Sequence, residues 1–335
     1  VGRKIVSEKA AVRGAWLLAF WPLSARFEAA VLPDAVMPFF LLLGLWLILE
    51  ARERRWALWW SAAAGLALAA GMTMRPDVLF LPVFLLAGAW LADRRCPGLG
   101  GLGAAAAAIV LVLGLHTWRN YEATGGKVAP LGLGNGISMW EGISQFGDTL
   151  GTLYGDARLA EKEGYATWAY PDGVDRDRAR FAEAVSIIRQ NPGFYAVHMI
   201  KRIPVLLTPD WIMSRKFAPS LMDHLREREG NSIGSYVAAY PAAAAARALV
   251  IGLQWATLAL CAIALLRGPV RRRWVIEAGG RARRLLWLPF AIIAYYIVIH
   301  IPTNTEARYF YPAIPFVLML ASAGWEMKGK TISNF

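Results

Sequence analysis

The sequence has few charged residues and few cysteines for its length. Only 18% of its 335 residues are charged, whereas 57% are hydrophobic. Soluble domains carry about a quarter charged residues, so this balance excludes an ordinary soluble domain and indicates a polytopic membrane protein. Cys96 lies at an expected cytoplasmic edge and Cys261 inside an apolar stretch, so no disulfide framework is expected.

Acidic residues are scarce in five segments of the chain. The excess of basic over acidic residues in these segments accounts for the net charge of +12. These segments hold 18 Lys and Arg against six Asp and Glu, whereas the loop from 118 to 247 has 15 basic and 14 acidic residues. Lys and Arg gather on the cytoplasmic side of membrane proteins, so the pattern predicts orientation and argues against a nucleic-acid partner. The basic segments are residues 1–13, 50–55, 93–98, 267–284 and 326–335.

Apolar segments recur along the chain, and we expect about eight transmembrane helices, several shorter than the roughly 20 residues that cross a bilayer alone. Both termini would then be cytoplasmic, in a plasma (inner) membrane. The expected fold is all-α, with five spans in 1–117, a mostly helical extracytoplasmic loop or cap in 118–246, and three spans in 247–335. The apolar segments are residues 14–27, 35–49, 56–72, 78–92, 99–117, 247–266, 285–301 and 312–325.

The sequence also lacks two familiar signals. No signal-peptide pattern precedes the first basic segment, and the chain opens at Val1. Either translation starts at a non-standard codon, or the chain is the back part of a longer protein. The glycines between 125 and 136 lack the spacing of a dinucleotide or P-loop fingerprint, so no organic cofactor is expected.

The long loop contains helical patterns. Residues 175–191 predict an amphipathic helix with Asp175 or Asp177 as its N-cap and Phe181 on its apolar face. Residues 193–207 mix apolar residues with cations, which is typical of a helix lying on the membrane surface.

Charged residues at expected outer helix starts are candidates for chemistry. Asp34 follows Pro33, and Arg75 and Asp77 flank a proline before the next apolar segment. A helix cap and a local ion pair explain them structurally. An outward arginine at headgroup depth also suits a phosphate, because its planar fork binds two oxygens. Both interpretations stay open.

The stretch 297–315, IVIHIPTNTEARYFYPAIP, places Glu306 and Arg308 between two apolar segments, with His300 nearby. Charges at the mouth of a membrane bundle are costly, so a polar functional site is one interpretation. An interfacial salt bridge with a belt of tyrosines is the other.

Four motifs together resemble a known family: WRNY, GLGNGISMWEG, NPGFYAVHMIKR and EARYFYPAIPFVLML. They resemble the dolichyl-phosphate-mannose-protein mannosyltransferase and aminoarabinose transferase superfamily, membrane glycosyltransferases of the GT-C fold. The resemblance implies an enzyme that moves one sugar from a polyprenyl-phosphate carrier to a lipid, glycan or protein acceptor on the outer face. Such enzymes often use a divalent metal ion, Mg²⁺ or Mn²⁺. The implied partners are the lipid-linked donor and membrane lipids.

The resemblance also suggests roles for individual residues. Asp34 is similar to the acidic residue of the second outer loop and is the expected catalytic residue. We expect Arg75, Arg119, Glu306 and Arg308 to bind substrate, with both Arg75 and Arg308 facing the phosphate. Asp34 and His300 are the candidates for metal contact.

The sequence departs from the family in one respect. The family's proton-accepting carboxylate lies in a first outer loop that would precede residue 14, and this chain has no such loop. A truncated, non-catalytic relative that binds lipid-linked sugar is therefore one alternative. A polytopic transporter of lipid-linked or small substrates is the other, because buried charges in a bundle also mark ion pathways.

Overall fold

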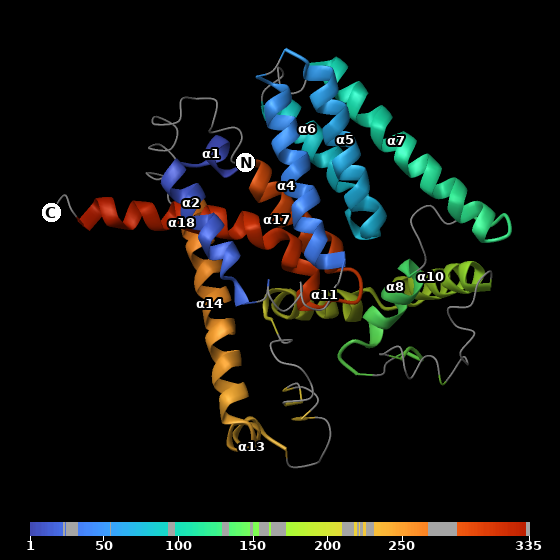
Figure 1. The fold of residues 1–335 in the computed structure, drawn as a ribbon. Helices are drawn as coiled ribbons and strands as arrows, with labels where there is room; N and C mark the ends of the chain where they lie inside the picture. The colour runs from blue at the N-terminus through green and yellow to red at the C-terminus, as the bar shows by residue number, and fades with distance from the viewer. Residues whose placement is uncertain are drawn as a thin grey trace. The chain divides into compact units, whose positions relative to one another are not determined.

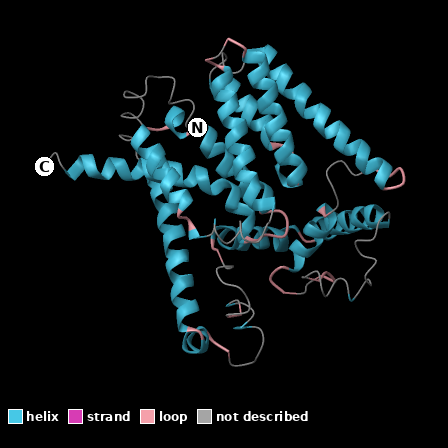
Figure 2. Cartoon of the chain, viewed as in Figure 1, coloured by secondary structure: helices cyan, strands magenta, loops and turns pink. Residues whose placement is uncertain are grey.

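The computed structural model of this chain is built from helices. Within the part that it describes there are helices and turns and no strand (Figure 2). The all-α fold class expected from the sequence is thereby confirmed for these residues. They are residues 1–22, 24, 33–53, 55–92, 98–128, 134–147, 150–153, 161, 172–209, 218–219, 221, 224–225, 231–266 and 287–332.

Three of the described helices are long and apolar enough to cross a membrane, namely α5 (Ala57–Met74), α7 (Gly98–Ala123) and α14 (Pro241–Leu266). These helices support a helical membrane protein, whereas eight crossings remain a prediction. Shorter apolar helices cover Ala35–Ala51, Pro76–Trp90 and Leu288–His300.

The expected first span, residues 14–27, does not coincide with one helix. Helix α2 (Glu8–Ala19) begins earlier, with Ser7 as its N-cap, and ends before Phe20. Residues 25–27 lie outside the described part of the chain, as does the arginine cluster within 267–284. The cytoplasmic placement of both termini therefore stays a prediction.

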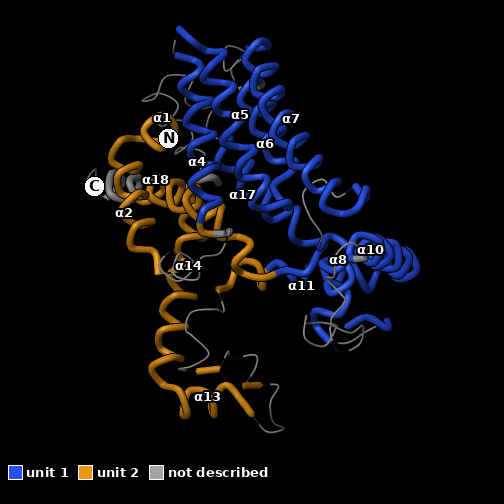
Figure 3. Tube along the Cα trace, turned by 45° about the vertical axis from the view of Figure 1, so that its right-hand side comes forward, with its two compact units in different colours: residues 1, 36–203, 284–305 blue, residues 2–35, 204–283, 306–335 orange. Residues whose placement is uncertain are grey.

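The chain folds into two compact units, coloured separately in Figure 3. The expected three parts, 1–117, 118–246 and 247–335, follow membrane topology instead and remain a prediction. Unit 1 comprises residues 1, 36–203 and 284–305, and unit 2 comprises residues 2–35, 204–283 and 306–335.

Unit 1 contains a bundle in which α5 and α7 run parallel (Figure 1). Their backbones approach closely, because a Cβ on Gly65 of α5 would lie 2.3 Å from the carbonyl oxygen of Ala105 of α7. Nearer the start of both helices, Leu58 lies beside Gly100. Small residues at helix contacts are typical of membrane bundles, as expected for the glycine- and alanine-rich segment 99–117.

Other helices of unit 1 extend this bundle. Helix α4 (Pro33–Ala51) is antiparallel to α5, since Met37 lies beside Gly71 and Gly44 beside Leu68. A short 3₁₀ helix, η1, follows α5 and leads into α6, which packs against α17. The bounds are Pro76–Val78 for η1, Leu81–Ala92 for α6 and Trp287–His300 for α17.

The close approach at Gly65 predicts a large difference between two glycine-to-alanine changes. Gly65→Ala is expected to destabilise the protein by about 1–3 kcal/mol, because the new methyl group overlaps the backbone of α7. Gly103→Ala is the control, because a Cβ there meets no atom within 4 Å and alanine favours a helix by up to about 1 kcal/mol. Melting temperatures in detergent measure both. Equal melting temperatures for the two variants would contradict the prediction.

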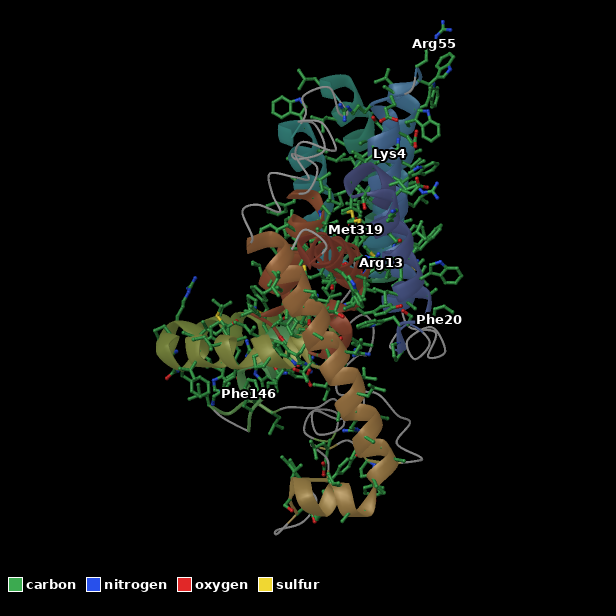
Figure 4. All side chains as sticks on the ribbon, turned by 90° about the vertical axis from the view of Figure 1, so that its left-hand side faces the viewer. Lys4, Arg13, Phe20, Arg55, Phe146 and Met319 are labelled. Carbon is green, nitrogen blue, oxygen red and sulfur yellow. The ribbon has the colours of Figure 1, made fainter. Side chains whose placement is uncertain are left out.

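Unit 2 is centred on α18 (Ile314–Ile332), which packs against α2 and α14. Both contacts are made at glycines. A Cβ on Gly14 would lie 3.2 Å from the Cα of Met319, which Figure 4 labels, and a Cβ on Gly324 would lie 2.9 Å from the carbonyl oxygen of Leu260. The expected last span therefore lies in the core of this unit. The unit also contains α1 (Gly2–Ile5), α13 (Ile233–Ala239) and η3 (Ala307–Ala313).

Three helices of the long loop belong to unit 1. They are α8 (Asn135–Ser144), α10 (Asp172–Gln190) and α11, which spans Pro192–Leu207 and passes into unit 2 after residue 203. The first two pack together, and the helix expected over 175–191 is confirmed with an earlier start. Phe181, expected on the apolar face of this helix, is 46% exposed. The core of this part comprises Ile137, Trp140, Ile143 and Ala184.

Asp177, one of the two residues expected to cap α10, caps the neighbouring helix α8 instead. The Asp177 carboxylate accepts hydrogen bonds from the backbone N–H groups of Gly134, Gly136 and Ile137, at 3.3, 3.0 and 3.2 Å. It therefore caps α8 across the packed pair, while Asp175 pairs with Lys127 at 2.5 Å. Glycine is needed at 136, because a Cβ there would lie 1.8 Å from the carbonyl oxygen of Asp177.

Candidate functional site

A buried ionic cluster lies where two helices of the unit 1 bundle end. Arg75 directly follows α5, and its Nε and Nη2 donate to the two carboxylate oxygens of Asp77, at 3.0 and 2.8 Å. His300, the last residue of α17, places its Nε2 2.9 Å from the same carboxylate. The side chains are 11%, 18% and 5% exposed for Arg75, Asp77 and His300 respectively.

Two tyrosines of α17 complete the surroundings of this cluster. The hydroxyl of Tyr295 donates to the backbone carbonyl of Asp77 at 2.7 Å, and the ring of Tyr296 stacks on His300. Burial alone would raise the pKa of the Asp77 carboxyl, but the charge of Arg75 and the contact with His300 hold that pKa well below its usual range. Asp77 is therefore ionised, and it neutralises the buried arginine.

A second charge pair lies in unit 2, at the start of η3. The Nη2 of Arg308 donates to Oε1 of Glu306 at 3.1 Å, and its Nε lies 2.8 Å from Oε2 of the same carboxylate as an ion pair. Its guanidinium also lies over the ring of Tyr309, 5.3 Å from the centroid. Burial would lower the pKa of Arg308, but the neighbouring carboxylate raises it, so the side chain stays charged. The Arg308 side chain is 30% exposed, against 11% for Arg75.

Two further residues, Arg119 and Asp34, were expected at the site. Arg119 is exposed near the end of α7, and its Nη2 donates to the side chain of Asn120 at 2.9 Å. Asp34 lies in the first turn of α4, and its side chain is outside the described part of the chain. Its expected roles as catalytic residue or metal ligand stay predictions.

The structure joins His300 to an ion pair that the sequence had already indicated. The Arg75–Asp77 pair was foreseen, whereas the contact between Asp77 and His300, 223 positions apart, was not. One signal could have found it. The expected topology placed the 75–77 turn and the end of the 285–301 segment on the same face, and Asp77 is the acidic residue of that turn.

The described residues give little support for a metal site. Among the residues that the structure describes, no group of three or more His, Cys, Asp or Glu side chains lies close enough to hold one ion. The Asp77 carboxylate beside His300 already binds Arg75 through both oxygens. No step through a metal is therefore derived, and Mg²⁺ or Mn²⁺ stays a prediction.

The first third of the chain resembles proteins of one family. Residues 1–118 match the dolichyl-phosphate-mannose-protein mannosyltransferase family. The resemblance proposed from the sequence is thereby confirmed over this part, which includes Asp34 and Arg75. At family level the match implies a polyprenyl-phosphate-sugar-dependent membrane glycosyltransferase, with a lipid-linked sugar donor as its partner.

The mannosyltransferase match ends at residue 118, where the motifs that first suggested the family begin. Those motifs, and with them Arg119, Glu306 and Arg308, lie beyond it. No curated protein and no solved structure matches the chain. The roles of the later residues therefore rest on chemistry and on their surroundings.

Proposed function

We propose that this protein is a membrane glycosyltransferase that moves one sugar from a polyprenyl-phosphate carrier to a lipid, glycan or protein acceptor on the outer face. The match of residues 1–118 to the mannosyltransferase family carries this proposal. The apolar helices α5, α7 and α14 support a membrane location, which an isoprenoid-linked donor requires.

The reaction needs a cation for the phosphate of the leaving group. The acceptor hydroxyl attacks the anomeric carbon, the bond from that carbon to the phosphate oxygen breaks, and polyprenyl phosphate leaves with the electron pair. Arg308 suits this role better than Arg75, because its side chain is the more exposed of the two. Each arginine is held by a carboxylate two residues away, which orients its fork before substrate binds.

The reaction also needs a base for the proton of the acceptor hydroxyl. Asp34 is the proposed base, since it lies in the first turn of α4 within the part of the chain that the family covers. Asp77 is a poor base, because its carboxylate is neutralised by Arg75 and its pKa is lowered.

The central test is transfer of a radiolabelled sugar in washed membranes that contain the full chain. The probe is a set of polyprenyl-phosphate-linked sugars, and the product is counted in the lipid, glycan and protein fractions. The proposal expects label in one fraction above membranes that lack the chain. Label that remains on the donor for every sugar supplied would reject it.

Asp34→Asn separates a base from a helix cap. As a base, Asp34 contributes about 10²–10⁴-fold to turnover, so the variant is expected to lose that much sugar transfer at an unchanged level of folded protein. Asparagine caps a helix about as well as aspartate, so a capping role alone would leave activity intact. Transfer at the wild-type rate would rule out Asp34 as the base.

A further inference from the structure

Arg202 of α11 is fully buried, although the sequence places it in a stretch expected to lie on the membrane surface. Its exposed fraction is 0%, whereas its neighbour Lys201 is exposed. Burying a guanidinium is costly unless its donors are all engaged. The expected surface helix thus has a buried face, which carries Arg202, and an exposed apolar face, on which Val197 and Ile200 are 50% and 67% exposed.

The guanidinium of Arg202 joins three separate pieces of unit 1. Its Nε donates to the side-chain oxygen of Gln145 at 3.2 Å, and its Nη1 donates to the carbonyl of Ile301 at 2.8 Å. Its Nη2 donates to the carbonyl of Gly142 near the end of α8. The cation also lies 5.4 Å from the ring centroid of Tyr195, about two turns of α11 earlier.

The partners of Arg202 hold the turn that follows α17, residues 301–305. Gln145 bonds to both backbone groups of Thr305, accepting from its N–H at 3.2 Å and donating to its carbonyl at 2.5 Å. The Tyr195 hydroxyl donates to the carbonyl of Pro302. The N–H of Asn304 donates to the carbonyl of Ser138 in α8 at 2.7 Å.

The turn and α8 pack closely at Gly142. A Cβ there would lie 3.0 Å from the backbone nitrogen of Asn304 and 3.2 Å from Nη2 of Arg202. Asn304 also donates from its side chain to Glu141 at 3.3 Å. Several polar groups of this turn thus bond to α8, to Gln145 directly after it, or to α11.

We infer that Arg202 is a positioning residue, which together with Gln145 and Tyr195 holds the turn 301–305 in one conformation. In the chain this turn directly follows His300, which contacts Asp77, and directly precedes Glu306. The inference rests on the proposed function for its catalytic consequence. A misplacement of about 1 Å, even from a change far from the chemistry, costs about 10²-fold in rate.

The first arm of the test measures sugar transfer. Arg202→Ala is expected to lower kcat/KM about 100-fold. The kcat/KM of Arg202→Lys is expected to lie between those of Arg202→Ala and wild type, because lysine keeps the charge but lacks the planar guanidinium that reaches three acceptors. Lys201→Ala, at the exposed neighbour, is the matched control and should stay within about twofold of wild type.

The second arm reports on the turn itself and needs no donor. Thr303→Cys is introduced with Cys96→Ser and Cys261→Ala, and its rate of reaction with a maleimide is measured in detergent. Arg202→Ala is expected to raise this rate at least about tenfold, since the turn opens more often once its contacts are lost. Gln145→Ala removes the bridge to Thr305 and should raise it as well, which keeps the test usable if Arg202→Ala does not fold.

The two arms separate the two claims. Faster labelling in the Arg202 or Gln145 variants, with no sugar transfer even by wild type, would keep the positioning of the turn and reject the proposed function. Labelling at the wild-type rate in Gln145→Ala and in folded Arg202→Lys would overturn the role of Arg202, whatever the activity. Rates raised equally by Lys201→Ala would also overturn it, because that change leaves the turn contacts intact.

Discussion

Arg308→Ala is expected to abolish sugar transfer from the polyprenyl-phosphate donor, with a loss of about 10²–10³-fold, while membrane insertion and protein level stay normal. The reason is that a preorganised cation at the developing phosphate charge stabilises the transition state most in a site with little water. The Arg308 side chain is held by Glu306, is charged and is 30% exposed, so it is open to a phosphate.

Two companion variants sharpen this expectation. Arg308→Lys keeps the charge without the planar fork and is expected to retain a small part of the activity. Arg55→Ala is the control, because this exposed arginine projects away from the helices, just before the start of α5 (Figure 4). Wild-type transfer by Arg308→Ala would exclude Arg308 as the phosphate ligand.

Asp77→Asn is expected to destabilise the protein by about 3–5 kcal/mol, the largest loss of stability that we predict. The change leaves the buried Arg75 without its carboxylate and takes the ionic partner from His300. A fall in melting temperature in detergent, together with a lower yield of folded protein, measures the effect.

The double variant Arg75→Met with Asp77→Leu is expected to recover much of this loss. Once both charges are removed, no unpaired ion is buried at this pair, and apolar side chains fill similar space. A double variant that is no more stable than Asp77→Asn would mean that the destabilisation does not come from an uncompensated Arg75.

Arg75→Ala distinguishes the two interpretations of that arginine. A phosphate ligand predicts lost transfer in a normally folded protein, whereas a structural ion pair predicts lost stability. Because Arg75 donates to both carboxylate oxygens of Asp77 and only 11% of its side chain is exposed, the surroundings favour the ion pair. If Arg75→Ala lowers transfer and the amount of folded protein to the same extent, the lost protein accounts for the lost transfer. Arg75 would then have no separate role in binding the donor.

Local patterns predicted the helices well, because apolar length and turn residues act over short stretches of chain. The membrane class, the Arg75–Asp77 pair and the helix within 175–191 came from such patterns. The capping of α8 by Asp177 was not predicted, because Asp177 faces α8 only when α10 packs against it. A capping signal in the sequence names a residue, but it does not say which helix that residue caps.

Composition and spacing alone determined that this is a helical membrane protein with few charges, and the sequence motifs indicated a family that residues 1–118 match. Only the tertiary structure decided which of those charges are buried together. Asp77 and His300 meet because α5 and α17 end at one place, and Arg202 is enclosed because α8 and the 301–305 turn pack onto one face of α11. Contacts between residues this distant in sequence depend on the packing of whole helices, whereas periodicity reports only on neighbours within a few turns.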